Sequence, residues 1–136
     1  MLQRIQSVWL ILASACAFVT LKLPTYSGTA GNGIPSSALM GMSNFMLTVL
    51  TVIIGVFALV TIFLYGNRKL QFRFCLLGIL LEVILLFLYY SQITKFLEGT
   101  LALTSVFHIG VLLFFGLAAK AINNDENLIK SSERLR

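Results

Sequence analysis

Charged side chains are scarce in this sequence. Of its 136 residues only 11% are Asp, Glu, Lys or Arg, whereas about a quarter of the residues are charged in an ordinary soluble domain. Hydrophobic residues make up 58% of the chain, and its mean hydropathy is +0.93. This balance excludes an ordinary soluble domain and is typical of a protein that lies in a membrane.

Residues that bind metals or act in catalysis are also few. The chain has two cysteines, Cys16 and Cys75, and one histidine, His108. Both cysteines lie inside apolar runs with no other metal ligand near them, so we interpret them as small core residues. The sequence has no cluster of Asp, His, Cys or Ser and no glycine-rich phosphate loop. We therefore expect no enzyme, no cofactor and no metal site.

Four apolar stretches make up most of the chain, at residues 5–23, 45–65, 72–90 and 101–119. A helix needs about 17 to 25 apolar residues to cross a bilayer, and lipid offers no hydrogen-bond partner to the backbone of an open strand. The sequence predicts an all-α integral membrane protein, with four transmembrane helices in an antiparallel up-down-up-down bundle. The uncharged segment 24–44 is rich in Gly and Ser and predicts a flexible loop.

The first stretch has a second interpretation. A basic residue, an apolar run and the tetrapeptide Ala13-Ser14-Ala15-Cys16 also resemble a secretory or lipoprotein signal, which would leave three spans. The apolar run continues past Cys16 through Val19, and this favours a membrane span.

The basic residues predict the orientation of the bundle. Eight of the ten Lys and Arg residues flank the spans on the side of the two chain ends, and only Lys22 and Lys95 lie on the other side. Cytoplasmic flanks carry such an excess, so both termini are expected in the cytoplasm. The net charge of +5 comes from these scattered flanks, which favours membrane lipids and not nucleic acid as the surroundings of the chain.

Glu82 is the most informative residue, because a carboxylate near the middle of the third span is costly in lipid. His108 is its natural partner, since it lies at a similar depth on the adjacent antiparallel helix. We expect a hydrogen bond or ion pair between them. Two interpretations stay open: a buried polar contact that only holds the helices together, or a proton relay or binding site for the polar group of a substrate, lipid or quinone.

The segment 120–136 mixes four basic with three acidic residues, and it can extend the fourth helix into the cytoplasm. Such a tail is either a surface for a partner protein or merely solvated. The candidate partner contacts at the two chain ends are Arg4, Asp125, Glu126, Arg134 and Arg136.

The two ends also carry a resemblance. Met1-Leu2-Gln3-Arg4-Ile5-Gln6 and the closing run from Asp125 to Arg136 resemble a family of small four-helix inner-membrane proteins of the Bacteroidota, described only as a domain of unknown function. Leu2 stands where an Ile is expected. The resemblance implies four spans in a bacterial inner membrane, and it implies no activity and no functional residues.

Two functions follow as hypotheses. The first is a non-catalytic accessory or interaction subunit of an inner-membrane complex, which docks on a membrane-protein partner through its cytoplasmic ends and bundle surface. The alternative is a small transporter or proton-linked module that uses Glu82 and His108. Both hypotheses are compatible with a homo-oligomer.

Overall fold

The structure is a computed structural model, and it describes residues 2–33, 35 and 37–135, without the side chains of residues 2–4 and 30. The chain is mostly helical. Its elements, in order, are the helices and strands α1 (Leu2–Val19), β1 (Pro24–Ala30), β2 (Ser37–Met40), α2 (Phe45–Phe63), α3 (Arg68–Ile93), β3 (Phe96–Leu101) and α4 (Val106–Arg134), with short 3-10 helices η1 (Leu64–Gly66) and η2 (Leu103–Ser105).

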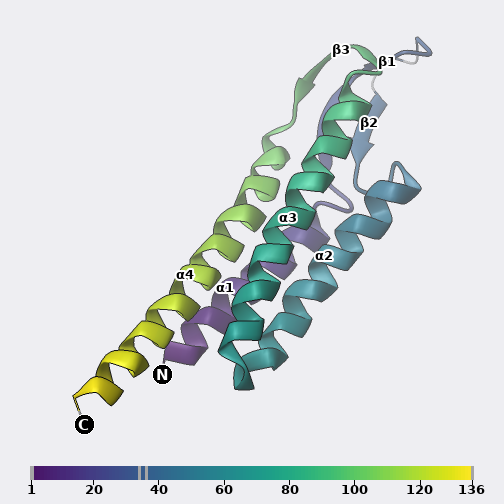
Figure 1. Cartoon of the computed structure of the whole chain (residues 1–136). Coiled ribbons are helices and arrows are strands. Elements are labelled where there is room, and N and C mark those ends of the chain that lie inside the picture. Colours follow the sequence, from purple (N-terminus) through teal and green to yellow (C-terminus); the bar gives the residue numbers. More distant parts are fainter. Residues whose placement is uncertain (1, 34, 36, 136) are drawn as a thin grey trace.

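The four helices form one antiparallel bundle (Figure 1). Helix α1 packs against α2 and α4, and α3 packs against the same two helices. Both chain ends lie at one end of the bundle, where α4 projects beyond the other helices, and the strands lie at the opposite end. This is the up-down-up-down arrangement that the sequence predicts.

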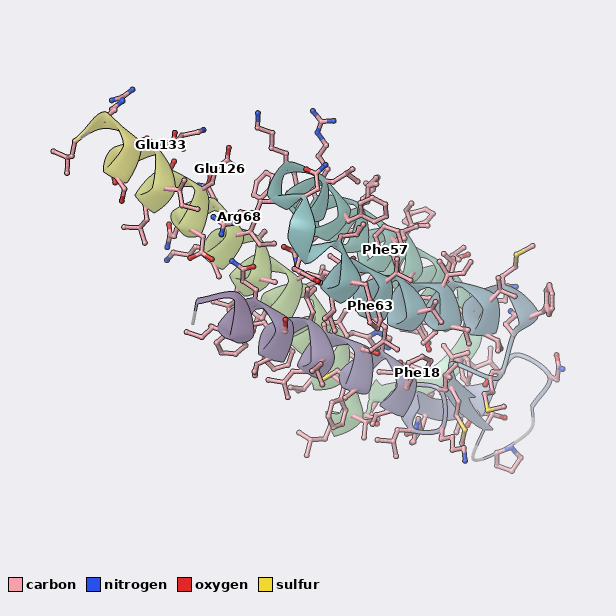
Figure 2. All side chains as sticks on the ribbon, turned by 90° about the horizontal axis from the view of Figure 1, so that it is seen from below. Phe18, Phe57, Phe63, Arg68, Glu126 and Glu133 are labelled. Carbon is pink, nitrogen blue, oxygen red and sulfur yellow. The ribbon has the colours of Figure 1, made fainter. Side chains whose placement is uncertain are left out.

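The bundle is apolar outside and partly polar inside. Large apolar side chains project from all around it in Figure 2, and Phe63 and Phe87, which are 79% and 70% exposed, belong to this outer layer. The interior instead holds polar side chains such as Thr51, Gln71 and Glu82. An apolar outer surface with polar side chains among the buried residues differs from a soluble protein and suits a bundle surrounded by lipid, where helix interfaces favour small and hydrogen-bonding residues.

Three helices of the described chain are long and apolar enough to cross a membrane. They are α2 continued by η1, α3, and α4 preceded by η2. The apolar part of α1, Ile5–Val19, is shorter. The first predicted span, 5–23, is therefore too long, because the chain leaves the helix after Val19 and enters β1 at Pro24.

The prediction of an all-α fold is wrong in one respect, since the chain also forms a small antiparallel sheet with the strand order β2-β1-β3. The segment predicted to be a flexible loop supplies β1 and β2. Strand β3 ends at Leu101, the first residue of the predicted span 101–119, and α4 begins only at Val106. Gly28 and Gly99 face each other across β1 and β3. A Cβ on Gly28 would overlap the carbonyl of Glu98, so this close pairing requires glycine.

Candidate functional site

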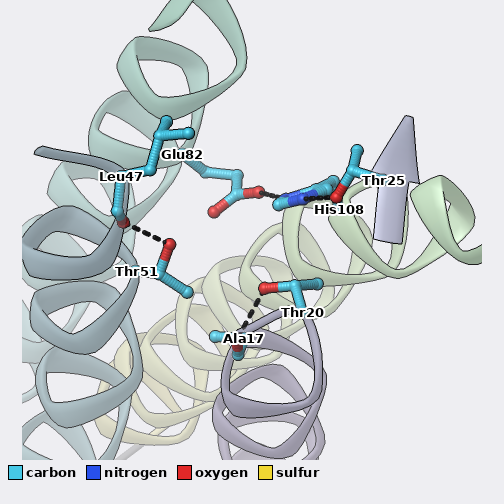
Figure 3. Close-up of polar contacts among 7 residues, drawn as sticks. All are labelled: Ala17, Thr20, Thr25, Leu47, Thr51, Glu82 and His108. Atoms are coloured by element: carbon cyan, nitrogen blue, oxygen red, sulfur yellow. Dashed lines mark hydrogen bonds and ion pairs between the residues drawn. The ribbon is translucent and has the colours of Figure 1, made fainter. Parts of the chain in front are cut away.

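Glu82 and His108 meet in the interior of the bundle (Figure 3). Glu82 lies near the middle of α3 and His108 in the first turn of α4. Nδ1 of the imidazole is 2.8 Å from Oε1 of the carboxylate, and each residue is 1% exposed. The structure therefore brings the two predicted residues together, at a distance typical of a charge-assisted hydrogen bond.

Two further side chains contact the imidazole. Nε2 of His108 lies 3.4 Å from Oγ1 of Thr25 in β1. The ring of Tyr89 stands edge-on to the imidazole, with 4.8 Å between the ring centroids. The Tyr89 hydroxyl is buried near Thr25 but makes no hydrogen bond of normal geometry in the described part of the chain. The site thus contains a polar atom whose hydrogen bonding is incomplete.

The sequence predicts neither of these two residues as part of the site. Thr25 lies in the segment expected to be a flexible loop, and nothing local to it predicts contact with α4. Tyr89 gives a usable signal, because it follows Glu82 by seven positions, or two helical turns, and so lies on the same face of α3. A tyrosine at this position is, however, equally typical of the belt of aromatic residues at a membrane interface.

A cavity of about 520 Å³ opens beside this cluster. It lies at the end of the bundle that carries the sheet, where α3, α4, β1 and β3 come together. Its volume falls in the range of sites for small organic molecules. The residues that line it are mostly apolar or aromatic, with a few hydroxyl groups and the imidazole: Thr25, Tyr26, Leu86, Tyr89, Tyr90, Ile93, Gly99, Leu101, Ser105 and His108.

Backbone pairing holds β1 over α4. The backbone N–H of Ala102 donates to the carbonyl of Thr25 at 3.0 Å, and Oγ1 of Thr104 donates to the carbonyl of Pro24. Because Thr25 is fixed on both sides of its peptide unit, its hydroxyl is held at the imidazole. The sheet is therefore part of the site and not only a connection between helices.

One of the residues predicted to contact a partner is not at the surface. Asp125 is only 5% exposed, and its Oδ2 accepts a hydrogen bond of 2.5 Å from Nε2 of Gln6 in α1. Its carboxylate thus makes an internal contact. Glu126 pairs with Lys130 at 3.1 Å, and Arg134 is exposed in the last turn of α4.

Two other predicted contact residues fall outside what can be described. The side chain of Arg4 and the whole of Arg136 lie outside the described residues. Among the residues that the structure does describe, no three His, Cys, Asp or Glu side chains come close enough together to hold a metal ion. Cys75 is fully buried in the core, and Cys16 is half-buried.

Removing either partner of the buried pair should destabilise the bundle. We expect Glu82→Leu and His108→Phe each to lower the free energy of unfolding by about 2 to 4 kcal/mol, because each leaves the other polar group buried and unpaired. The double variant should lose less than the sum, by about 1 kcal/mol or more. Equilibrium unfolding in mixed detergent micelles measures all three values.

The surface pair of Glu126, which is partly exposed, and Lys130, which is exposed, gives the matched control, with an expected coupling of about 0.3 to 0.5 kcal/mol. Additive losses at Glu82 and His108 would contradict the contact between them.

Comparison with known proteins gives a family and no function. The chain matches no curated protein. It matches no solved structure. One family model, described as a domain of unknown function (DUF4293), covers residues 2–135, which is nearly the whole chain. The protein therefore belongs to this family.

Proposed function

We propose that this protein is a membrane-embedded binding protein that takes a small, largely apolar molecule into the cavity beside Glu82 and His108. The observation that carries the proposal is the position of His108, which bonds Glu82 through one ring nitrogen and is also one of the residues that line the cavity. A polar contact that served only to hold α3 and α4 together would gain nothing from an open cavity beside it. The geometry instead suits a ligand with one polar group.

The same proposal gives the site a place in the membrane. The excess of basic residues near the two chain ends favours a cytoplasmic location for that end of the bundle, in a bacterial inner membrane. The cavity, at the opposite end, then lies near the outer interface of that membrane. Tyr90 and Leu101 at its rim are 65% and 66% exposed, so a molecule dissolved in the bilayer reaches it without crossing the bundle.

A variant that fills the cavity tests the proposal. We expect the wild-type protein, extracted in a mild detergent, to carry a small molecule that organic extraction and mass spectrometry detect. Ser105→Phe places a ring in the cavity and should reduce the amount of that molecule at least about fivefold, since a ligand and a phenyl group cannot share the space.

The control is Ser132→Phe on the exposed surface of α4, at the other end of the bundle, and it should leave the bound amount unchanged. Thermal unfolding shows whether both variants are folded. Equal amounts of the molecule in wild type and a folded Ser105→Phe protein would contradict the proposal, as would a wild-type protein that carries none.

A second function, that of a non-catalytic accessory subunit, is favoured by a different observation. Helix α4 continues beyond the bundle, and in this part Leu128, Ile129 and Leu135 are 55%, 43% and 89% exposed. Charged residues alternate with them, among them Lys130 and Arg134. A protruding helix of this kind offers apolar anchors to the cytoplasmic part of a membrane-protein partner.

A short truncation separates this function from the first. Removing residues 128–136 keeps Ile122 and Asp125, which are buried in the bundle. If the protein is an accessory subunit, a stoichiometric partner crosslinked to the full chain in its native membrane should disappear with the truncated chain. If both forms are recovered without a partner, the docking function is excluded, and ligand binding at the cavity is unaffected.

A further inference from the structure

We infer that the cavity holds one hydrocarbon chain of a membrane amphiphile with an anionic head group, and that the head group lies beside Lys95 at the end of α3. A free fatty acid and an anionic phospholipid both have this chemistry. The inference rests on the proposed function and names the chemical class of the ligand.

The first step is the length and direction of the cavity. Its lining residues extend from His108, which lies at the level of Glu82, to Ile93 at the end of α3. This distance is about 16 Å along the helix axis. The hydrocarbon core of a bilayer is about 30 Å thick, so the cavity is about as long as the hydrocarbon layer of one leaflet. It also runs along a helix that is long and apolar enough to cross the membrane, and therefore parallel to the lipid chains.

The second step is the width of the cavity. A volume of about 520 Å³ divided by a length of about 16 Å gives a mean cross-section of about 33 Å². An α-helix about 10 Å across has a cross-section of about 80 Å². The cavity is therefore too narrow for a helix of another protein and suits a single extended chain.

The third step is the chemistry of the lining. The described residues that line the cavity include no Lys, Arg, Asp or Glu, and Leu86, Ile93 and Leu101 contribute alkyl side chains. Water is unfavourable there because a buried water needs about 2 to 4 polar partners, and an empty cavity loses the dispersion contacts of its walls. Tyr90 and Leu101 at the rim are exposed. A hydrocarbon chain from the surrounding lipid can therefore enter and fill the cavity.

The fourth step is the head group. Lys95 is exposed and follows Ile93 by two positions, at the end of the cavity where a chain aligned with the lipid has its polar end. The ion pairs among the described residues do not include Lys95. Glu98 lies on the opposite face of β3 from Gly99 and Leu101, which line the cavity. An anionic head group would therefore meet the ammonium group of Lys95.

Native mass spectrometry of the full-length protein, released from lipid nanodiscs, tests the inference. The nanodiscs contain equal amounts of a phosphatidylcholine, the phosphatidylglycerol with the same chains, and palmitic acid. We expect one amphiphile to stay bound to the protein, and its mass distinguishes the phospholipid from the fatty acid. Phosphatidylglycerol or palmitate should be retained at least about threefold more often than phosphatidylcholine, because Lys95 attracts an anionic head group.

Two variants separate the chain from the head group. Ser105→Phe fills the cavity and should abolish retention. Lys95→Gln leaves the cavity unchanged, so an amphiphile should stay bound, but the preference for an anionic head group should be lost. The matched control is Lys22→Gln, an exposed lysine that follows α1 at the same end of the bundle, and it should change neither.

The outcomes separate this inference from the proposed function. A folded wild-type protein that retains no amphiphile, or a folded Ser105→Phe protein that retains as much as wild type, would overturn the inference. Equal retention of the three compounds, or an unchanged preference in Lys95→Gln, would overturn the anionic head group. A molecule without a hydrocarbon chain that co-purifies from the native membrane and is lost in Ser105→Phe would also overturn the inference, but it would support the proposed function.

Discussion

The hydrogen bond between Glu82 and His108 is the contact on which the end of the bundle that carries the sheet depends. It places the first turn of α4 level with the middle of α3, although α3 continues to Ile93, about 16 Å further along its axis. The chain must return over this distance before α4 begins. The six residues of β3 span about 20 Å as an extended strand, which covers it, whereas a helix of the same length would not.

The sheet and the cavity follow from this geometry. A returning strand beside α3 exposes an unpaired backbone edge, and an unpaired edge is unfavourable near lipid. Strand β1 pairs with β3 and satisfies this edge, which brings Thr25 to the imidazole. Two strands fill the space beside α3 less completely than the ends of two helices would, and the cavity lies there. The site beside His108 therefore follows from the position that the contact between Glu82 and His108 gives to α4.

Polar contacts of the same kind join each pair of neighbouring helices. Oγ of Ser14 in α1 donates to the carbonyl of Gly55 in α2, and Nε2 of Gln71 in α3 donates to the carbonyl of Thr61 in α2. Helices α1 and α4 are joined by the hydrogen bond between Gln6 and Asp125, and α3 and α4 by Glu82 and His108. Because lipid leaves little hydrophobic driving force between helices, such contacts fix which faces meet.

Hydropathy and helical depth are properties of short segments, so the sequence predicts the bundle and the approach of Glu82 to His108. The sheet cannot be predicted from short segments, because β1 pairs with a strand about seventy residues away in the sequence. The glycines of β1 are, by themselves, typical of a loop. Without the sheet, neither the contact of Thr25 with His108 nor the cavity could be predicted. Asp125 was expected at the surface because charged residues near a chain end usually are; only packing shows that Gln6 covers it.

The most direct test of this account is nitrogen-15 NMR of the imidazole in lipid nanodiscs, since His108 is the only histidine of the chain. The account predicts that Nδ1 is strongly hydrogen-bonded, that the proton it shares with Glu82 exchanges slowly with water, and that the Nδ1 signal is altered in Glu82→Gln. An imidazole whose protons exchange freely with water, or an Nδ1 signal that is unchanged in Glu82→Gln, would contradict a buried hydrogen bond between the two residues.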